Sequence, residues 1–269
     1  MTSVPAAPSS HRPTDALTRW VAGFIVVILL DASQLLAFYP DRTATLWAWT
    51  IQPELSAMVL GSVYTGGAYF FARVLFGASW QEVAAGFPAI ALFVWMATLA
   101  TALHFDRFAE DSLPFAAWAA LYVVTPLLVP YLYLRNRRRA RVAGGAPLPR
   151  GIRTGLAVVG GLIVALALLV FAVPDAAIGD WPWTLTPLTA RITAAVVALY
   201  GAVWLSVAAH GTWTPARIPL QSHVIGLAVF LVSVARDESV VDWGPLALVV
   251  VAVAAAMLAV SAVLAWKAA

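Results

Sequence analysis

Residues 40–53 read PDRTATLWAWTIQP, and residues 174–187 read PDAAIGDWPWTLTP. The Pro-Asp pair, the Trp-x-Trp-Thr motif and the closing proline keep the same spacing in both segments. Each matched position is displaced by 134 residues (from 40 to 174), about half of the 269-residue chain. Arg19 and Arg153, at the start of the apolar run before each segment, keep the same displacement. The sequence therefore predicts a tandem duplication.

The composition indicates which medium surrounds the protein. Hydrophobic residues make up 62% of the chain and charged residues only 11%. Soluble domains contain roughly 45–50% apolar and about 25% charged residues. A soluble core of this size cannot bury so much apolar surface, so we expect the protein to be embedded in lipid. Because cysteine is absent, disulfides, thiolate metal sites and thiol redox chemistry are excluded.

Apolar runs long enough to cross a bilayer recur eight times along the chain. Proline opens several of these runs, because at the first helical position its missing N–H would have no partner anyway. The expected spans are about 20–38, 53–77, 83–104, 114–135, 153–173, 187–210, 218–235 and 245–266.

The predicted fold class is all-α: a polytopic membrane protein with eight transmembrane helices arranged as a 4+4 parallel tandem repeat. Residues 17–141 form the first four-helix repeat and residues 153–269 the second, joined by a cytoplasmic Gly/Pro/Arg linker at 142–152. Residues 1–16 are predicted to be a disordered cytoplasmic tail. Because each repeat has an even number of spans, both repeats enter the membrane from the same side, which implies a pseudo-two-fold axis along the membrane normal. A signal peptide is the alternative interpretation of the first run.

The basic residues set the expected orientation. Seven of the sixteen lie between Arg135 and Arg153, where they suit anionic lipid headgroups better than nucleic acid. The positive-inside rule therefore predicts that both termini are cytoplasmic, in a protein that we expect to lie in the plasma membrane. Both Trp-x-Trp segments then lie on the outer side. The four basic residues outside are Arg42, Arg107, Arg191 and Arg236.

Two interpretations of the repeated tryptophans are open. An aromatic belt would place Trp47, Trp49, Trp181 and Trp183 at headgroup depth. A structured loop would instead fold back over the helices, and its two copies would roof a cleft on the pseudo-axis, with tryptophan docked against lipid or a ligand. A belt does not require the recurrent spacing, whereas a structured loop does.

One half of the chain carries polar residues that the other lacks. Asp31 is the only acid well inside an apolar run, and Gln34 lies one turn further along the same helix face. A carboxylate in hydrocarbon costs roughly 2.5–3.5 kcal/mol, so we expect Asp31 to face the bundle and to have a partner. Arg191 is the predicted partner of Asp31 or Glu54, unless it reaches headgroup phosphates instead. The matched positions in the second half are Ala165, Leu168 and Leu188.

The histidines and the single lysine give no cofactor site. His104 closes the third span and could act as a metal ligand or general base beside Asp31 and Glu54. No second histidine lies near it in sequence and no metal-ligand spacing occurs, which favours a solvated interfacial histidine. His210 and His223 would have to face one another to bind haem. Lys267 lies at the end of a span, as an anchor rather than a Schiff base. We predict neither a metal nor a cofactor.

The sequence therefore predicts an outward-facing, tryptophan-lined cleft that binds, or transports, a small or amphiphilic molecule. The candidate ligand-binding residues are Asp31, Gln34, Trp47, Trp49, Glu54, His104, Trp181, Trp183 and Arg191. A membrane-embedded enzyme acting on a lipid or isoprenoid is one alternative, with Asp31, Glu54 or His104 as acid or base. A structural or assembly subunit is another, with the tryptophan loops docking a partner. The predicted partners are membrane lipids and not nucleic acid, and no oligomeric state follows from the sequence.

Overall fold

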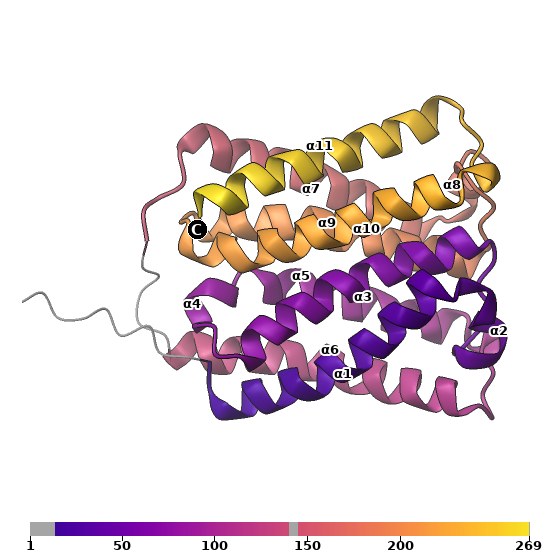
Figure 1. Cartoon of the computed structure of the whole chain (residues 1–269), viewed down its shortest axis with the longest axis horizontal. Helices are drawn as coiled ribbons and strands as arrows, with labels where there is room; N and C mark the ends of the chain where they lie inside the picture. The colour runs from indigo at the N-terminus through magenta and orange to yellow at the C-terminus, as the bar shows by residue number, and fades with distance from the viewer. Residues whose placement is uncertain (1–13, 140–144, 269) are drawn as a thin grey trace, which may run out of the picture.

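The protein is a bundle of long helices in a computed structural model that describes residues 14–139 and 145–268 (Figure 1). Eight helices are long and apolar enough to cross a membrane. They are α1 (Ala16–Phe38), α3 (Glu54–Leu75), α5 (Gly86–Leu103), α6 (Leu113–Arg139), α7 (Arg150–Ala172), α9 (Pro187–His210), α10 (Arg217–Arg236) and α11 (Pro245–Lys267). No strand occurs within the described ranges. The predicted all-α fold with eight helices able to span a membrane is confirmed for the described residues.

Local capping explains why these helices begin and end close to the predicted positions. The Asp15 carboxylate accepts the N–H of Thr18 at 3.2 Å, so α1 begins a turn earlier than its apolar run. The Thr186 hydroxyl accepts the N–H of Thr189 at 3.2 Å and caps α9. Gly211 then ends α9 at φ +71°, a left-handed conformation that glycine adopts without a Cβ clash.

Short elements lie at both ends of the bundle. At one end, which we call the tryptophan end, are α2 (Thr43–Leu46), α8 (Asp175–Ile178) and the 3-10 turns η1 (Pro40–Arg42), η2 (Phe105–Arg107) and η4 (Glu238–Val240). At the other, the linker end, are α4 (Trp80–Val83), η3 (Thr214–Ala216) and both ends of the described chain. Of the predicted tail and linker, residues 1–13 and 142–144 lie outside the described ranges. The N–H of Thr14 donates to the Ala78 carbonyl at 3.3 Å, and residues 150–152 already belong to α7.

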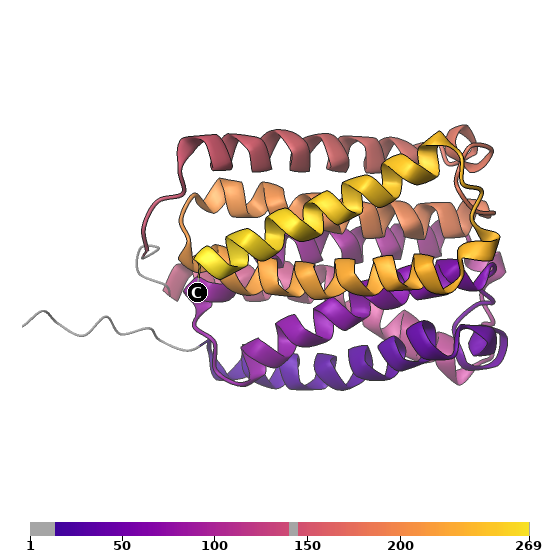
Figure 2. The same cartoon turned by 45° about the horizontal axis from the view of Figure 1, so that its top comes forward.

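The long helices pair in a regular pattern. Along their lengths α1 packs on α3 and α7 on α9, while α5 packs on α6 and α10 on α11. The other extensive contacts cross between the first and second halves of the chain, joining α5 to α9 and α10 to α3. The halves therefore interlock. Figure 1 shows α1 and α6 on the lower side of the bundle and α7 and α11 on the upper side, and in Figure 2 α1 lies along the lower border and α7 along the upper border.

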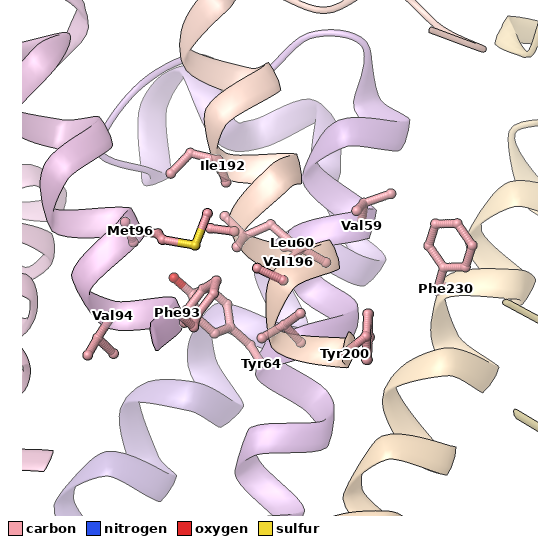
Figure 3. Close-up of a cluster of buried hydrophobic side chains, with 14 of the residues drawn as sticks. Val59, Leu60, Tyr64, Phe93, Val94, Met96, Ile192, Val196, Tyr200 and Phe230 are labelled. Atoms are coloured by element: carbon pink, nitrogen blue, oxygen red, sulfur yellow. The ribbon is translucent and has the colours of Figure 1, made fainter. Parts of the chain in front are cut away.

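The core lies where α3, α5, α9 and α10 meet, as Figure 3 shows. Its buried side chains include Val59, Leu60, Tyr64, Phe93, Val94, Met96, Ile192, Val196, Tyr200 and Phe230. Hydroxyl groups also join α3 to the second half: Ser222 donates to the Gly66 carbonyl at 2.7 Å, and the hydroxyls of Ser62 and Tyr200 are 3.0 Å apart. These bonds fix the position of α3 against α9 and α10, because hydrocarbon offers polar groups no alternative partner.

Glycines allow a close approach between α7 and α9. A Cβ added to Gly160 of α7 would lie 2.7 Å from the carbonyl oxygen of Gly201 in α9. Only glycine fits at such a distance from a backbone atom. Small residues at a helix crossing are a common means of association in membranes.

Candidate functional site

The two tryptophan loops (residues 39–53 and 173–187) fold back over the bundle at the tryptophan end. The Ala48 carbonyl accepts the N–H of Ala109 at 3.0 Å, and the Pro182 carbonyl accepts the N–H of Asp242 at 2.7 Å. Each donor lies in the loop before the last helix of its half. Trp49 and Trp183 are both only 4% exposed. These two indoles are therefore packed against protein, as the structured-loop interpretation expects, rather than standing free in a headgroup layer.

The first loop packs against a filled aromatic cluster. Trp47 and Trp49 meet the ring of Trp118 edge to face, with centroids 5.6 and 4.8 Å apart. The Tyr122 ring lies 4.1 Å from that of Trp118, and the Tyr122 hydroxyl is 2.9 Å from that of Tyr64. Neither of the two described cavities is lined by a tryptophan of this loop. The two loop copies thus do not roof one shared cleft, because the first has its own aromatic packing.

The second loop borders a groove. Trp181 and Trp183 meet edge to face at 5.3 Å and line a cavity of about 280 Å³ between α7, α9, α10 and α11. No charged side chain contributes to its lining. Leu166 on α7 and Val249 and Val253 on α11 line it and are 53%, 55% and 42% exposed. The groove therefore opens at the side of the bundle, between α7 and α11.

Few polar atoms lie along this groove, and one of them has no partner. The indole N–H of Trp183 donates to the Ser56 hydroxyl at 3.0 Å, and the Tyr200 hydroxyl is satisfied by Ser62. The indole N–H of Trp181 is buried and has no acceptor among the described residues. Buried donors are nearly always paired, so a group that reaches this nitrogen would gain a hydrogen bond.

The groove exists because α11 carries smaller side chains than α6. Trp118 and Tyr122 lie four and eight residues after the proline at the start of α6. Val249 and Val253 take the same places after the proline that opens α11. The aromatic side chains in the first half are buried, whereas the two valines border open space. Sequence reasoning missed these residues, although the Ala- and Val-rich composition of the last span was a signal.

His104 and Arg191 meet across the two halves of the chain. The Nη1 of Arg191 lies 2.6 Å from the Nε2 of His104, and its Nε donates to the Phe171 carbonyl at 3.1 Å. His104 lies beyond the end of α5 and is half-buried. Burial first, and then the Arg191 guanidinium, lower the pKa of His104 below its usual value of 6.5. The contact needs a neutral His104, since Nε2 must accept the hydrogen bond. His104 is therefore bonded rather than simply solvated.

The predicted pairing of Asp31 with Arg191 is wrong. Asp31 and Gln34 lie on the exposed face of α1, and Asp31 makes no hydrogen bond or ion pair with another described residue. The reason is that α1 packs on α3 through its other face, at Ala32 and Leu36, while Arg191 adjoins α7. Glu54 is half-buried at the start of α3 and also lacks a charged partner within the described ranges. Of the polar residues expected to converge, only His104 and Arg191 do.

A second, smaller cavity of about 90 Å³ lies at the centre of the bundle. Its lining includes His223, which is buried within α10. The Nδ1 of His223 is 2.8 Å from the Ser261 hydroxyl, and its Nε2 has no partner among the described residues. No three His, Asp or Glu residues in the described ranges are grouped so as to hold a metal ion.

Comparisons of the chain with protein-family models, curated proteins and solved structures found no match.

Proposed function

We propose that the groove between α7 and α11 binds a hydrocarbon chain of a membrane amphiphile. The observation that carries the proposal is an uncharged cavity of about 280 Å³ that opens at the side of a membrane-spanning bundle. Apolar cavities do not take up water, so hydrocarbon is the natural occupant. Sites for whole small molecules measure roughly 300–1,000 Å³, so this groove suits one chain of a larger molecule.

The tryptophans favour one direction of binding. Trp181 and Trp183 lie at the tryptophan end of the groove, and the Trp181 N–H lacks an acceptor. Tryptophan at the boundary between hydrocarbon and headgroups contacts chains with its ring and polar groups with its N–H. The ester or hydroxyl oxygen of the amphiphile would then accept this hydrogen bond while its chain extends along α11.

We propose the 4+4 tandem repeat as the framework of this site. Two matched arginines support it: Arg19 Nε donates to the Leu75 carbonyl at 3.1 Å, and Arg153 Nε to the Ala208 carbonyl at 2.9 Å. In each half, the arginine of the first long helix thus reaches the end of the second. The packing pairs of the long helices repeat between the halves in the same way. With both termini cytoplasmic in a plasma membrane, as the arginine distribution favours, the tryptophan end faces outward.

Photolabelling tests the proposal. The purified protein is reconstituted into phosphatidylcholine vesicles that contain a trace of phosphatidylcholine with a diazirine on one acyl chain. After irradiation, labelled peptides are mapped by mass spectrometry. We expect peptides covering residues 163–170 and 246–257 to be labelled more strongly than the exposed face of α6, at Val123 and Leu127. Uniform labelling of all lipid-facing helices would contradict the proposal.

A matched pair of variants sharpens the test. Val249→Trp places in α11 the side chain that Trp118 provides in α6, and we expect it to remove most of the labelling within the groove. Val263→Trp is the control, because Val263 is equally exposed on α11 but does not line the groove. Equal labelling of the groove peptides in both variants would contradict binding of the chain in the groove.

The enzyme alternative has weaker support, because neither Asp31 nor Glu54 makes a hydrogen bond or an ion pair with His104.

A further inference from the structure

One face of α1 is exposed along the whole length of the helix. Its residues recur at intervals of three and four, which places them on one side of an α-helix. They are Trp20, Phe24, Val27, Asp31, Gln34 and Phe38, all of them exposed. The same intervals are typical of the contact row between two paired helices. Large apolar side chains thus flank two polar ones in the middle of this row.

Asp31 and Gln34 have no partner within the described part of the protein. Neither takes part in a hydrogen bond or an ion pair there. Asp31 lies seven residues before the end of α1, which corresponds to about 10 Å along the helix axis. An aspartate side chain is too short to reach the headgroups from that depth, unlike the long side chains of lysine and arginine. The lipid cannot supply the missing hydrogen bonds.

We infer that this face binds α1 of a second copy of the protein, in a two-fold symmetric dimer. The row carries both a donor and an acceptor: the Gln34 amide donates, and the Asp31 carboxylate accepts. In a parallel pair related by a two-fold axis along the membrane normal, corresponding residues of the two helices lie at the same depth. Because Asp31 and Gln34 are one helical turn apart, the Gln34 amide of each copy reaches diagonally across the axis to the carboxylate of the partner's Asp31. Two hydrogen bonds form, so the exposed row of one α1 supplies the donor and the acceptor that the same row of the second copy needs.

The rest of the surface argues against a different contact between copies. Within the described ranges, Asp31 is the only charged side chain exposed along the middle of a membrane-spanning helix. A head-to-tail contact with another face would therefore offer the carboxylate no cation. Pairing through α1 also leaves the groove free, because α1 and α7 lie on opposite borders of the bundle (Figures 1 and 2). The dimer is thus independent of the proposed function.

Single cysteines test the dimer directly, since the chain contains no cysteine of its own. Val27, in the α1 row, and Val158, on α7, are 67% and 63% exposed. In native membranes oxidised with copper phenanthroline, we expect Val27→Cys to give a disulfide-linked dimer on a non-reducing gel and Val158→Cys to remain monomeric. Equal cross-linking of the two variants, or none at Val27→Cys, would overturn the proposal.

Second substitutions separate polar recognition from apolar contact. In the Val27→Cys background, Gln34→Leu and Asp31→Leu should each remove most of the dimer, whereas Asp31→Asn should retain it because an amide oxygen still accepts. Both positions are exposed, so thermal unfolding of the monomer in detergent should be unchanged, which excludes misfolding as the cause. Cross-linking that survives both leucine substitutions, or that joins the chain to a protein of another size, would refute the self-complementary pair.

Discussion

The two tryptophan loops share their spacing and their backbone anchor but lie in opposite surroundings. In the first half, Trp118 and Tyr122 of α6 fill the space beneath the loop. In the second half, Val249 and Val253 of α11 leave that space open to the side of the bundle. At matched places in the two halves, small side chains on one helix thus leave a groove where large side chains on the other helix fill the space. No additional motif is needed, and the other copy keeps the rigid packing.

Truncating the aromatic cluster should give the largest difference in the free energy of unfolding between matched substitutions in the two halves. Trp118→Ala removes a buried indole that packs on both tryptophans of the first loop and donates to the Thr101 hydroxyl. We expect the free energy of unfolding to fall by about 3–5 kcal/mol. Val249→Ala, at the matched place, should cost less than about 1 kcal/mol because its side chain is half exposed. Unfolding of the purified protein in detergent measures both, and equal losses would mean that the second half is as tightly packed as the first.

A matched pair of glycines should give the next effect. Gly67 and Gly201 occupy positions related by the 134-residue displacement. A Cβ at Gly201 would lie 2.9 Å from the Gly160 carbonyl oxygen, a backbone atom that cannot move away. At Gly67 it would meet only the flexible end of Leu29, at 3.1 Å. We expect Gly201→Ala to destabilise by about 1–3 kcal/mol and Gly67→Ala by clearly less, in the same unfolding assay. The reverse order would show that α7 can separate from α9 at little cost.

The smallest effect concerns the hydrogen bond between His104 and Arg191, one of the contacts that join the two halves of the chain. Because the pKa of His104 is lowered below 6.5, the unfolded chain binds more protons than the folded one as the pH falls through that value. The contribution of the His104 contact to the free energy of unfolding is therefore fully present above about pH 6.5. It decreases below that pH, because protonation of His104 breaks the hydrogen bond from Arg191. Unfolding temperatures measured on both sides of pH 6.5 should show a modest decrease in acid. His104→Gln, which cannot titrate, is the control: if it shows the same decrease, another group is responsible.

The positions of the helices could be predicted because their signals are local. Pro187 and Gly211 bound α9, and the apolar run of each span fixes its extent. The faces of the helices could not be predicted in the same way. In lipid the outer face of a helix is as apolar as its inner face: Phe24 and Val27 point outward from α1, while Ala32 and Leu36 point inward. Hydrophobic periodicity therefore did not show that Asp31 faces away from the bundle.

The site was only partly predictable for a related reason. The Trp-x-Trp motif indicated a loop that folds back as one of two open interpretations, because its spacing is encoded in one short segment. The groove depends instead on the small side chains of α11 near that segment. The open space they leave could be found only once α7, α9, α10 and α11 were placed around it. The contact between His104 and Arg191 likewise joins residues far apart in the chain, through the packing of α5 on α9.

The interlocking of the halves has a consequence for biosynthesis. As the chain emerges from the ribosome, α3 and α5 enter the bilayer before α9 and α10 have been made. Until then the face of α3 that will meet α10 borders lipid, and Ser62 has no Tyr200 hydroxyl beside it. The first half can form its own pairs, α1 with α3 and α5 with α6, but it cannot complete its core. A polypeptide released after Arg139 would thus be an unfinished insertion intermediate, with the surface that α9 and α10 normally cover exposed to quality-control proteases.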